Sequence, residues 1–250
     1  NSNFYLMERT LPMSKYFDVG YMIQSLPTLL SYIHVTLMIT AVSAVLGILL
    51  GSLIAIVRIK KVPVLNQILV VFISFMRGTP FLVQLFLIYF GVPEIMSHLG
   101  MNVRNLPGLV FVYVVFTLHI AAYSAEIMRA SISAVSQGEK EAAMAIGMTE
   151  LQSYVRIILP QAFTLSIPPL TNLIIGMLKG TALVFNVGVV DMMRRADLMG
   201  GNSQRYLELF VDAAIIYAVL IFIVTTAGRW IEKRYTVGER QTERVLLSEE

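Results

Sequence analysis

Long apolar stretches separated by short polar segments dominate this chain. Five apolar runs, at about 29–57, 64–90, 106–131, 157–185 and 207–230, carry few charged residues. Each is long enough to cross a hydrocarbon layer of roughly 30 Å at about 1.5 Å per helical residue. Backbone groups without access to water must form hydrogen bonds within their own segment, so such runs fold as helices. The pattern therefore predicts an all-α integral membrane protein with five transmembrane helices.

The first run carries a stripe of small residues. Ser43, Gly47, Gly51 and Ala55 recur at every fourth position and fall on one helix face. Small side chains let a second helix backbone approach closely within the membrane. We expect close helix packing along this stripe, against a helix of the same subunit or of a partner.

The second run is interrupted near its centre by Arg77-Gly78-Thr79-Pro80. Proline removes one backbone donor, and an arginine at membrane depth must face protein or a water-filled cavity. The two halves are each too short to cross the bilayer alone. The sequence therefore predicts one kinked helix over 64–90.

The flanking segments suggest an orientation. Residues 1–28 mix aromatic and charged side chains, which is typical of an interfacial segment, and no cleavable signal peptide is expected. Of the 19 Lys and Arg residues, eleven fall on the side that we take as cytoplasmic, so the N-terminus is expected outside and the tail 236–250 inside. The outer segment 186–206 is expected to be a solvated loop with ion pairs or a contact for a binding protein. The eleven are Arg58, Lys60, Lys61, Arg129, Lys140, Arg156, Arg229, Lys233, Arg234, Arg240 and Arg244.

Composition excludes several other classes. The chain is 56% hydrophobic, and its net charge of +3 is spread along the sequence, so we expect no nucleic-acid partner. It has no cysteine, and His34, His98 and His119 lie on different segments, so we expect no metal site. No phosphate-binding GxxxxGK[ST] loop and no catalytic cluster occurs. The chain is therefore not expected to be an enzyme, and any ATP hydrolysis belongs to another polypeptide.

The segment 138–156 is a charged loop between the third and fourth runs. Gly138 can end the third helix, and acidic residues such as Glu139 favour the first turn of a new one. Gly147 can end that new helix in the left-handed conformation, and Pro160 can begin the fourth span. A plain connector or a docking helix for a partner would both fit these signals.

The letters of this loop favour the docking role. Glu141-Ala142-Ala143, then Gly147, then Ile157-x-Leu159-Pro160 resemble the EAA loop of permease subunits of ABC importers. The resemblance implies that the loop forms a cytoplasmic coupling helix that docks into a separate ABC ATPase subunit. The residues implied to couple are Glu141, Ala142, Ala143, Gly147 and Met148. It also implies no cofactor in this chain, with ATP and magnesium bound by the partner.

Motifs in the membrane narrow the resemblance to the polar amino acid uptake branch, which includes histidine, glutamine, arginine and cystine permeases. The similarity covers about residues 26–235 and implies a permease of the type I ABC importer kind. Implied partners are a second copy or a similar permease subunit, an extracytoplasmic substrate-binding protein, an amino acid substrate and membrane lipid. The motifs are Arg77-Gly78-Thr79-Pro80 with Gln84-Leu85, Ala122-Tyr123-x-Ala125-Glu126-Ile127-x-Arg129, Pro169-Leu170-x-Asn172 and Lys179-x-Thr181.

Polar residues at membrane depth are candidates for contact with the cargo. Arg77 and Lys179 suit a carboxylate, whereas Thr171, Asn172 and Gln84 offer neutral hydrogen bonds. Hydrogen-bonded helix contacts are the competing interpretation. Glu126 and Arg129, three positions apart, are expected to form an ion pair within one helix.

Departures from the branch bear on the cargo. Gly180 stands where relatives commonly carry an acid beside the lysine, and Leu173 stands where several permeases for cationic amino acids carry an acid. We therefore expect a neutral polar amino acid, cystine among them. The alternatives are an ion-coupled secondary carrier and a membrane scaffold or sensor.

Overall fold

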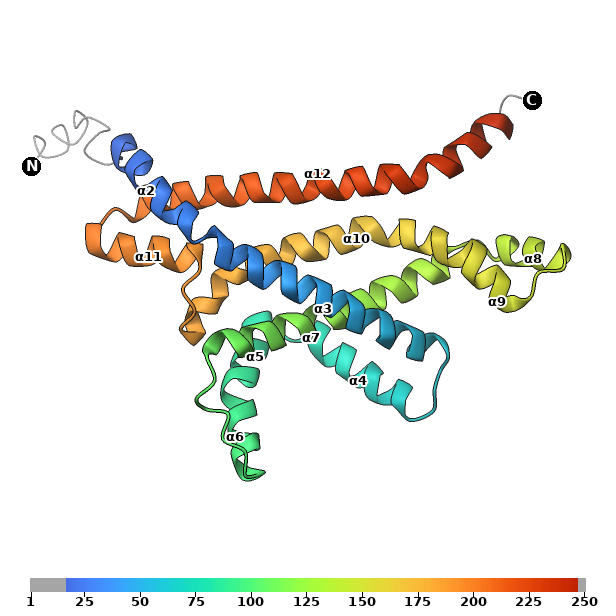
Figure 1. Cartoon of the computed structure of the whole chain (residues 1–250), viewed down its shortest axis with the longest axis horizontal. Coiled ribbons are helices and arrows are strands. Elements are labelled where there is room, and N and C mark those ends of the chain that lie inside the picture. The colour runs from blue at the N-terminus through green and yellow to red at the C-terminus, as the bar shows by residue number, and fades with distance from the viewer. Residues whose placement is uncertain (1–16, 247–250) are drawn as a thin grey trace, which may run out of the picture.

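The computed structural model describes residues 17–246, with side chains described to residue 235, and this part is helical without strands. Four long helices, α3, α7, α10 and α12, run roughly along the long axis of the molecule (Figure 1). The α-helices are α2 (Val19–Ser31), α3 (Ile33–Ile59), α4 (Leu65–Gly78), α5 (Phe81–Phe86), α6 (Val92–His98), α7 (Gly108–Ala134), α8 (Gln137–Ala145), α9 (Glu150–Ser153), α10 (Leu159–Gly180), α11 (Met192–Ser203) and α12 (Tyr206–Leu246). Two π-helical segments, Leu87–Gly91 and Tyr154–Ile158, and a 3-10 helix, Thr181–Val187, connect some of them.

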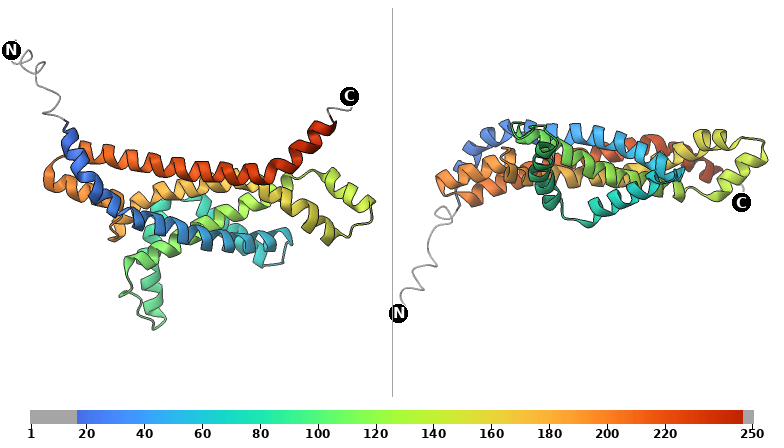
Figure 2. Two further views of the ribbon diagram at one scale, coloured as in Figure 1. Left: turned by 45° about the horizontal axis from the view of Figure 1, so that its top comes forward. Right: turned by 90° about the horizontal axis from the view of Figure 1, so that it is seen from below.

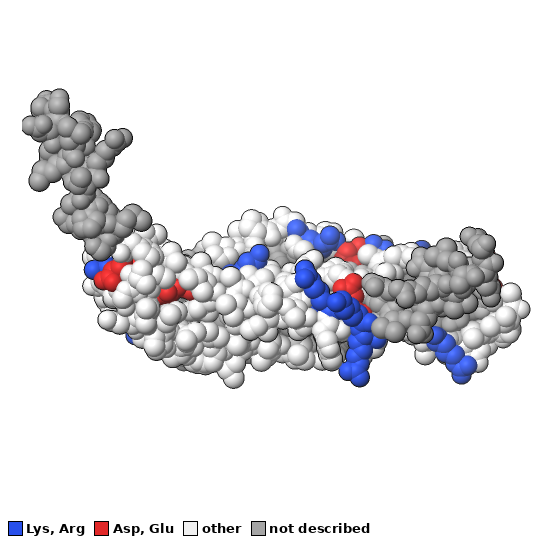
Figure 3. All heavy atoms as spheres, turned by 90° about the horizontal axis from the view of Figure 1, so that it is seen from above, with Lys and Arg blue, Asp and Glu red and all other residues white. Residues whose placement is uncertain are grey.

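Five helical stretches of the described chain are long and apolar enough to cross a membrane, in agreement with the number predicted. They are Val19–Ile59, Phe81–His98, Gly108–Ala134, Glu150–Val187 and Tyr206–Tyr235. Large apolar side chains along them remain exposed, for example Leu53 at 62% and Phe222 at 71%. On the face shown in Figure 3, most Lys and Arg side chains lie toward the end that carries the later part of α12.

The small-residue stripe packs α3 closely against α7. A Cβ atom at Gly47 would lie 2.6 Å from Cβ of Ile120 and 2.9 Å from the carbonyl oxygen of Thr117. Gly51 likewise faces Ser124, and Ser43 and Ala55 are buried. The expectation of close packing is confirmed, and the partner helix belongs to the same subunit. Small residues are needed here because a larger side chain on α3 would overlap with atoms of α7.

The second predicted span is divided, which corrects the expectation of one kinked helix over 64–90. α4 ends at Gly78, Thr79 and Pro80 are extended, and a new helix begins at Phe81. Proline favours this because it lacks a backbone donor and pushes the preceding residue out of the helical region. α5 and α6 then turn sharply away from the long axis, as Figures 1 and 2 show.

The N-terminal boundary also differs from the prediction. Residues 19–28 belong to α2, which joins α3 through Tyr32, so they lengthen the first span. Asp18 caps α2 by accepting a hydrogen bond from the Tyr21 amide at 3.1 Å, and it lies 3.4 Å from the Arg205 guanidinium. The remainder of the predicted interfacial segment, residues 1–16, lies outside the described residues.

The loop that precedes the fourth span is more helical than predicted. α7 ends at Ala134, so Gly138 does not end the third helix but lies in the first turn of α8. The fourth helix already begins at Glu150, and Pro160 lies inside it. The π-helical segment Tyr154–Ile158 lies just before this proline, with the Leu159 amide bonded to the Tyr154 carbonyl. A wider helical turn accommodates the proline without breaking the helix.

Two further segments are ordered where loops were expected. The outer segment 186–206 contains α11, whose Met192 and Ala196 are buried in the contact with α2 and α12. Its expected ion pairing is present between Arg194 and Asp197. The tail 236–250 continues α12 as a helix to Leu246, and residues 247–250 lie outside the described part.

Candidate functional site

The polar loop folds as a short helix, α8, that stands at one end of the molecule (Figure 1). Ser136 caps it by accepting a hydrogen bond from the Gly138 amide at 3.3 Å, and Glu139 lies in its first turn. A hydroxyl at the N-cap and an acid in the first turn both stabilise a helix start.

The end of α8 follows the predicted glycine mechanism. Gly147 has a φ angle of +84°, which confirms the left-handed conformation expected for it. Its amide donates to the Met144 carbonyl at 3.0 Å, and the Met148 amide donates to the Ala143 carbonyl at 3.1 Å. These two bonds form a Schellman motif, in which a residue with a side chain at the Gly147 position is strained.

A second set of contacts holds α8 in place relative to α9. Lys140 donates to Glu150 at 3.0 Å and lies over the Tyr154 ring at 5.4 Å. The hydrogen bond to the Glu150 carboxylate raises the pKa of Lys140. Thr149 and Gln152 form a capping box that starts α9. The loop is therefore a defined structural unit within this chain.

The candidate coupling residues differ in how far their side chains are exposed. Glu141, Ala142 and Gly147 are exposed, and Met148 is partly buried, whereas Ala143 is only 1% exposed. Ala143 therefore packs within its own subunit instead of offering its side chain to a partner. Three large apolar side chains of α8, its C-cap and α9 are also exposed: Met144 at 55%, Ile146 at 75% and Leu151 at 74%.

Sequence reasoning did not single out these three apolar residues. The signal was present, because large apolar side chains in a polar loop between spans have no lipid to face. Exposed apolar side chains in a polar segment that also exposes an acid, Glu141, are typical of a protein contact.

A separate cavity of about 450 Å³, which we call the Asn172 cavity, lies among α5, α7, α10 and the 3-10 helix. Asn172 is its polar contribution from α10, and His119 and Tyr123 contribute from α7. The remaining lining is mostly apolar: Phe81, Ile127, Pro169, Leu173, Gly176, Met177, Gly180 and Leu183.

Gln84 does not line this cavity. It is 1% exposed, and its amide nitrogen donates to the carbonyl oxygens of Met76 at 2.7 Å and Thr79 at 3.0 Å. Its amide oxygen lies 2.8 Å from Nδ1 of His119. The side chain thus donates to backbone carbonyls that have no helical partner at the break between α4 and α5. These hydrogen bonds stabilise the break.

His119 forms a polar contact between α7 and α5. Because the amide nitrogen of Gln84 is the donor to Met76 and Thr79, its oxygen accepts, and Nδ1 of His119 donates. His119 also stacks on Tyr123 at 4.6 Å between ring centroids. No three His, Asp or Glu side chains converge as a metal site within the described residues.

The other candidate cargo residues lie outside the cavity lining. Arg77 is exposed and lies over the Tyr123 ring at 5.6 Å, so it approaches the cavity through that aromatic side chain. Thr171 faces Gly228 of α12, where an added Cβ atom would lie 2.5 Å from the Thr171 hydroxyl. Lys179 is exposed elsewhere on α10. The structure therefore brings together Asn172 and, indirectly, Arg77.

The predicted ion pair within α7 is confirmed and extended. Nε of Arg129 donates to Glu126 at 3.1 Å, and Arg58 from α3 donates to the other carboxylate oxygen. Asp212, an acid of α12 within the fifth span, accepts a hydrogen bond from Ser25 at 2.6 Å. Both acids are thus engaged by neighbouring side chains and lie outside the Asn172 cavity.

Five apolar spans, a structured polar loop with exposed apolar and acidic side chains, and a mainly apolar cavity define a helical membrane protein. The family described as "Binding-protein-dependent transport system inner membrane component" matches residues 47–237, so the chain belongs to this family of inner membrane transport proteins.

Named relatives support this placement. The chain is 38% identical over 218 residues to the probable amino-acid ABC transporter permease protein PatM of Vibrio harveyi, covering 87% of this chain and 96% of PatM. It is 36% identical over 235 residues to the L-cystine transport system permease protein TcyL of Bacillus subtilis, covering 94% of this chain and 98% of TcyL.

Solved structures agree on the fold. A crystal structure of an amino acid ABC transporter with histidines has a TM-score of 0.78 at 33% identity and covers 87% of this chain and 99% of the other. The MetNI methionine ABC transporter, at 19% identity and a TM-score of 0.66, shares the fold. These findings confirm the five-helix permease fold and favour an ABC importer over an ion-coupled secondary carrier.

Proposed function

We propose that this chain is the transmembrane subunit of an ATP-driven importer for a polar amino acid. The observation that carries the proposal is the exposure of Glu141, Met144 and Ile146 on α8 and at its end, on a helix held by the Schellman motif at Gly147 and by the Lys140–Glu150 pair. A short helix that is held at both ends and has exposed side chains can bind a separate ATPase. Movement of the ATPase would then displace the helix and, through it, α7 and α10.

The division of labour follows from the same features. The partner ATPase binds ATP and magnesium, and this chain performs no catalysis. ATP-driven movement of the partner displaces α8, and α10 carries that displacement along its length because it is continuous with α9 through the π-helical segment. The N-terminus lies outside, the C-terminus lies in the cytoplasm, and an extracytoplasmic binding protein delivers the cargo.

A second permease subunit, either identical or similar, completes the translocation path. The Asn172 cavity opens to the surface of this subunit. A hydrophilic solute needs a wall on every side to cross hydrocarbon, since lipid cannot satisfy its polar groups. The cavity edges and the exposed Lys179 are therefore the proposed contribution of this subunit to a shared path.

The cargo class follows from the cavity lining. Asn172 offers a neutral hydrogen-bonding group, and no acidic side chain lines the cavity among the described residues. The cationic side chain of a cargo such as arginine would have no counter-charge there. The side chain of a neutral polar amino acid carries no charge and needs none. Relatives named for L-cystine, arginine and glutamate/aspartate show that family membership by itself does not select the cargo. We propose a neutral polar amino acid, with cystine as the first to test.

Reconstitution tests this proposal directly. The chain is placed in proteoliposomes with its ATPase and binding protein, and uptake of labelled cystine, glutamine, arginine and glutamate is compared. We expect uptake that requires ATP and binding protein, persists when ionophores collapse ion gradients, and is fastest for a neutral amino acid. Uptake that stops with the ion gradient but not with ATP removal contradicts the proposal.

A further inference from the structure

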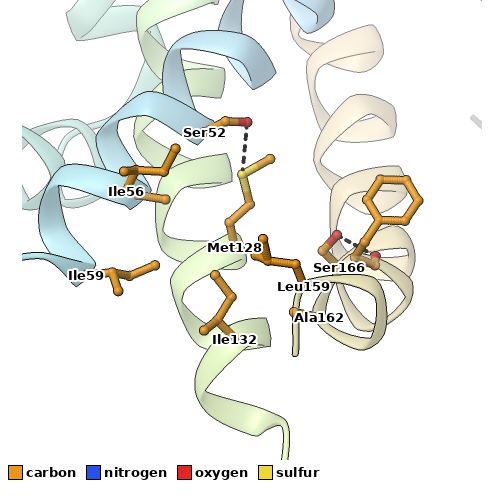
Figure 4. A pocket seen from close by; sticks show the side chains of 10 residues that line it. Ser52, Ile56, Ile59, Met128, Ile132, Leu159, Ala162 and Ser166 are labelled. Carbon is orange, nitrogen blue, oxygen red and sulfur yellow. Dashed lines mark hydrogen bonds between the residues drawn. The ribbon is translucent and has the colours of Figure 1, made fainter. Parts of the chain in front are cut away.

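A second cavity lies between α3, α7 and α10, away from the Asn172 cavity (Figure 4). We call it the apolar cavity, and its volume is about 310 Å³. Ile56 and Ile59 from α3, Met128 and Ile132 from α7, and Leu159 from α10 point toward it. Pockets of this size are large enough to hold a small-molecule ligand or part of a larger one.

The two hydroxyl groups in the lining are already engaged. Ser52 donates to the Ile48 carbonyl at 2.8 Å and contacts the Met128 sulfur at 3.3 Å, and Ser166 donates to the Phe163 carbonyl at 2.7 Å. No hydroxyl donor in the lining therefore remains free, and the other lining side chains are apolar. The cavity is suited to hydrocarbon.

A third cavity, of about 460 Å³, continues from the apolar one toward the α8 end of the same helices. The two cavities share Ile59 and Ile132 in their walls. We call the third one the basic cavity, since its lining includes four cationic side chains: Arg58, Lys61, Arg129 and Lys140.

The charges of the basic cavity do not balance. Glu126 bonds to both Arg58 and Arg129, and Glu150 pairs with Lys140. Lys61 is exposed and has no ion pair within the described residues, and Nε of Arg58 is buried there without a hydrogen-bond partner. Four cations are thus accompanied by two carboxylates. The excess of two positive charges favours binding of an anionic group such as a phosphate.

From this polarity gradient we propose that the two cavities form one binding site for an anionic phospholipid. Its phosphate lies against Lys61 and Arg58, and one acyl chain enters between Ile56 and Leu159. The basic end stands at the loop side of the membrane, where headgroups lie, and the apolar end stands deeper within the spans. The proposed function enters only in assigning that side to the cytoplasmic leaflet.

Other occupants fit the two cavities less well. A soluble anion would leave the apolar cavity unused, and an apolar protein segment would leave the excess positive charge without a partner. Basic pockets between transmembrane helices attract anionic headgroups through the same electrostatics. Because the site joins α3 to α7 and to the segment that leads into α8, a bound lipid would stiffen the base of the coupling loop.

Lipid retention tests the headgroup end. The complete transporter is reconstituted in nanodiscs of equal phosphatidylglycerol and phosphatidylcholine, extracted gently and examined by native mass spectrometry for bound lipid. We expect retained phosphatidylglycerol in the wild type. Lys61→Gln should retain about fivefold less, as expected for one basic side chain near a membrane surface, and Lys61→Arg should restore it.

The matched control is Lys60→Gln, which removes the same charge from the neighbouring exposed position outside the cavity lining. It should retain lipid like the wild type. Equal losses in both variants indicate general surface attraction and overturn the proposal. So does displacement of the lipid by millimolar glycerol phosphate, which would identify a site for soluble anions.

The acyl end has its own pair of variants. Ile56→Trp fills the apolar cavity and should lower retention several-fold, whereas Leu53→Trp changes a lipid-facing residue of the same helix that does not line the cavity. Assembly with the ATPase, followed by size-exclusion chromatography, shows that each variant is folded. Full retention by Ile56→Trp overturns the two-cavity site. Retention does not depend on uptake, so a failure of amino acid transport would count against the proposed function alone.

Discussion

The polar loop that contains α8 and α9 and the Asn172 cavity differ in the range of the contacts that form them. The loop takes its shape from neighbours in sequence: Ser136 starts α8, Gly147 ends it, and Glu150 fixes Lys140 from ten residues away. The cavity instead joins Phe81, His119 and Asn172, which come from three separate helices. A locally determined unit can move as one body, whereas a cavity shared between helices changes shape when any of them moves.

In the proposed mechanism, this difference determines how a displacement of α8 changes the Asn172 cavity. α8 contacts the rest of its chain mainly through α9 and the π-helical segment Tyr154–Ile158. The cavity depends on α10 for one wall and on α5 and α7 for the others. Displacing the loop should therefore alter the cavity, while changes in the cavity should leave the loop intact.

The largest effect is expected from Gly147→Val. A β-branched residue is strained at a φ angle of +84°, at a cost of about 1–2 kcal/mol or more, so α8 should lose its defined end. We expect uptake to fall more than about tenfold with membrane insertion unchanged. Gly138→Ala is the control, since its added Cβ meets its nearest neighbour, Oγ of Ser136, at an ordinary 3.5 Å. Normal uptake by Gly147→Val removes the loop from the mechanism.

Glu141→Lys should have the next largest effect. Glu141 is exposed and has no ion pair in the described part of the chain, so a charge reversal is felt through the partner and not through the fold. We expect about tenfold slower uptake and weaker co-purification of the ATPase, with the melting temperature of the isolated chain unchanged. Glu141→Gln should lie between the two. A melting temperature that falls along with uptake would show an internal role instead.

Gln84→Leu tests the cavity side through stability. It leaves the carbonyl oxygens of Met76 and Thr79 without their donor, and such buried groups cost about 1–3 kcal/mol. We expect a melting temperature lower by several degrees, with co-purification of the ATPase retained. Loss of the ATPase with no thermal shift would mean that the break between α4 and α5 communicates with α8 directly.

The smallest effect is expected from Asn172→Ala. It removes the polar group that α10 contributes to the cavity, and it should slow uptake a few-fold while leaving ATPase assembly unchanged. Asn186→Ala, at an asparagine outside the cavity lining whose amide donates to the Leu183 carbonyl, serves as the control. Unchanged uptake kinetics in Asn172→Ala would take Asn172 out of the cargo path.

Predictions from sequence succeeded where the cause was local. The left-handed Gly147 and the Glu126–Arg129 pair each follow from neighbours within a turn or two, and the stripe of small residues on α3 follows from the period of a single helix. Predictions of boundaries were weaker. The sequence indicates a disturbance at Arg77–Pro80, but only the hydrogen bonds of Gln84 explain how a complete break is tolerated there.

The candidate site shows the same division. Asn172 faces the cavity, but Gln84 and Thr171, which are also polar residues within the spans, are used in contacts within the chain. Polarity at membrane depth identifies residues that must have a partner, but it does not say whether that partner is cargo or protein.

By itself, the sequence determined the solvent of this protein, the number of its spans and the left-handed glycine that ends α8, because those depend on hydrophobic length and on local backbone preferences. The tertiary structure decided which helix lies against the stripe on α3, how α4 and α5 are joined, and which polar side chains face the Asn172 cavity. Such contacts join residues far apart in the chain, and their energies depend on the relative position of helices, which no local pattern contains.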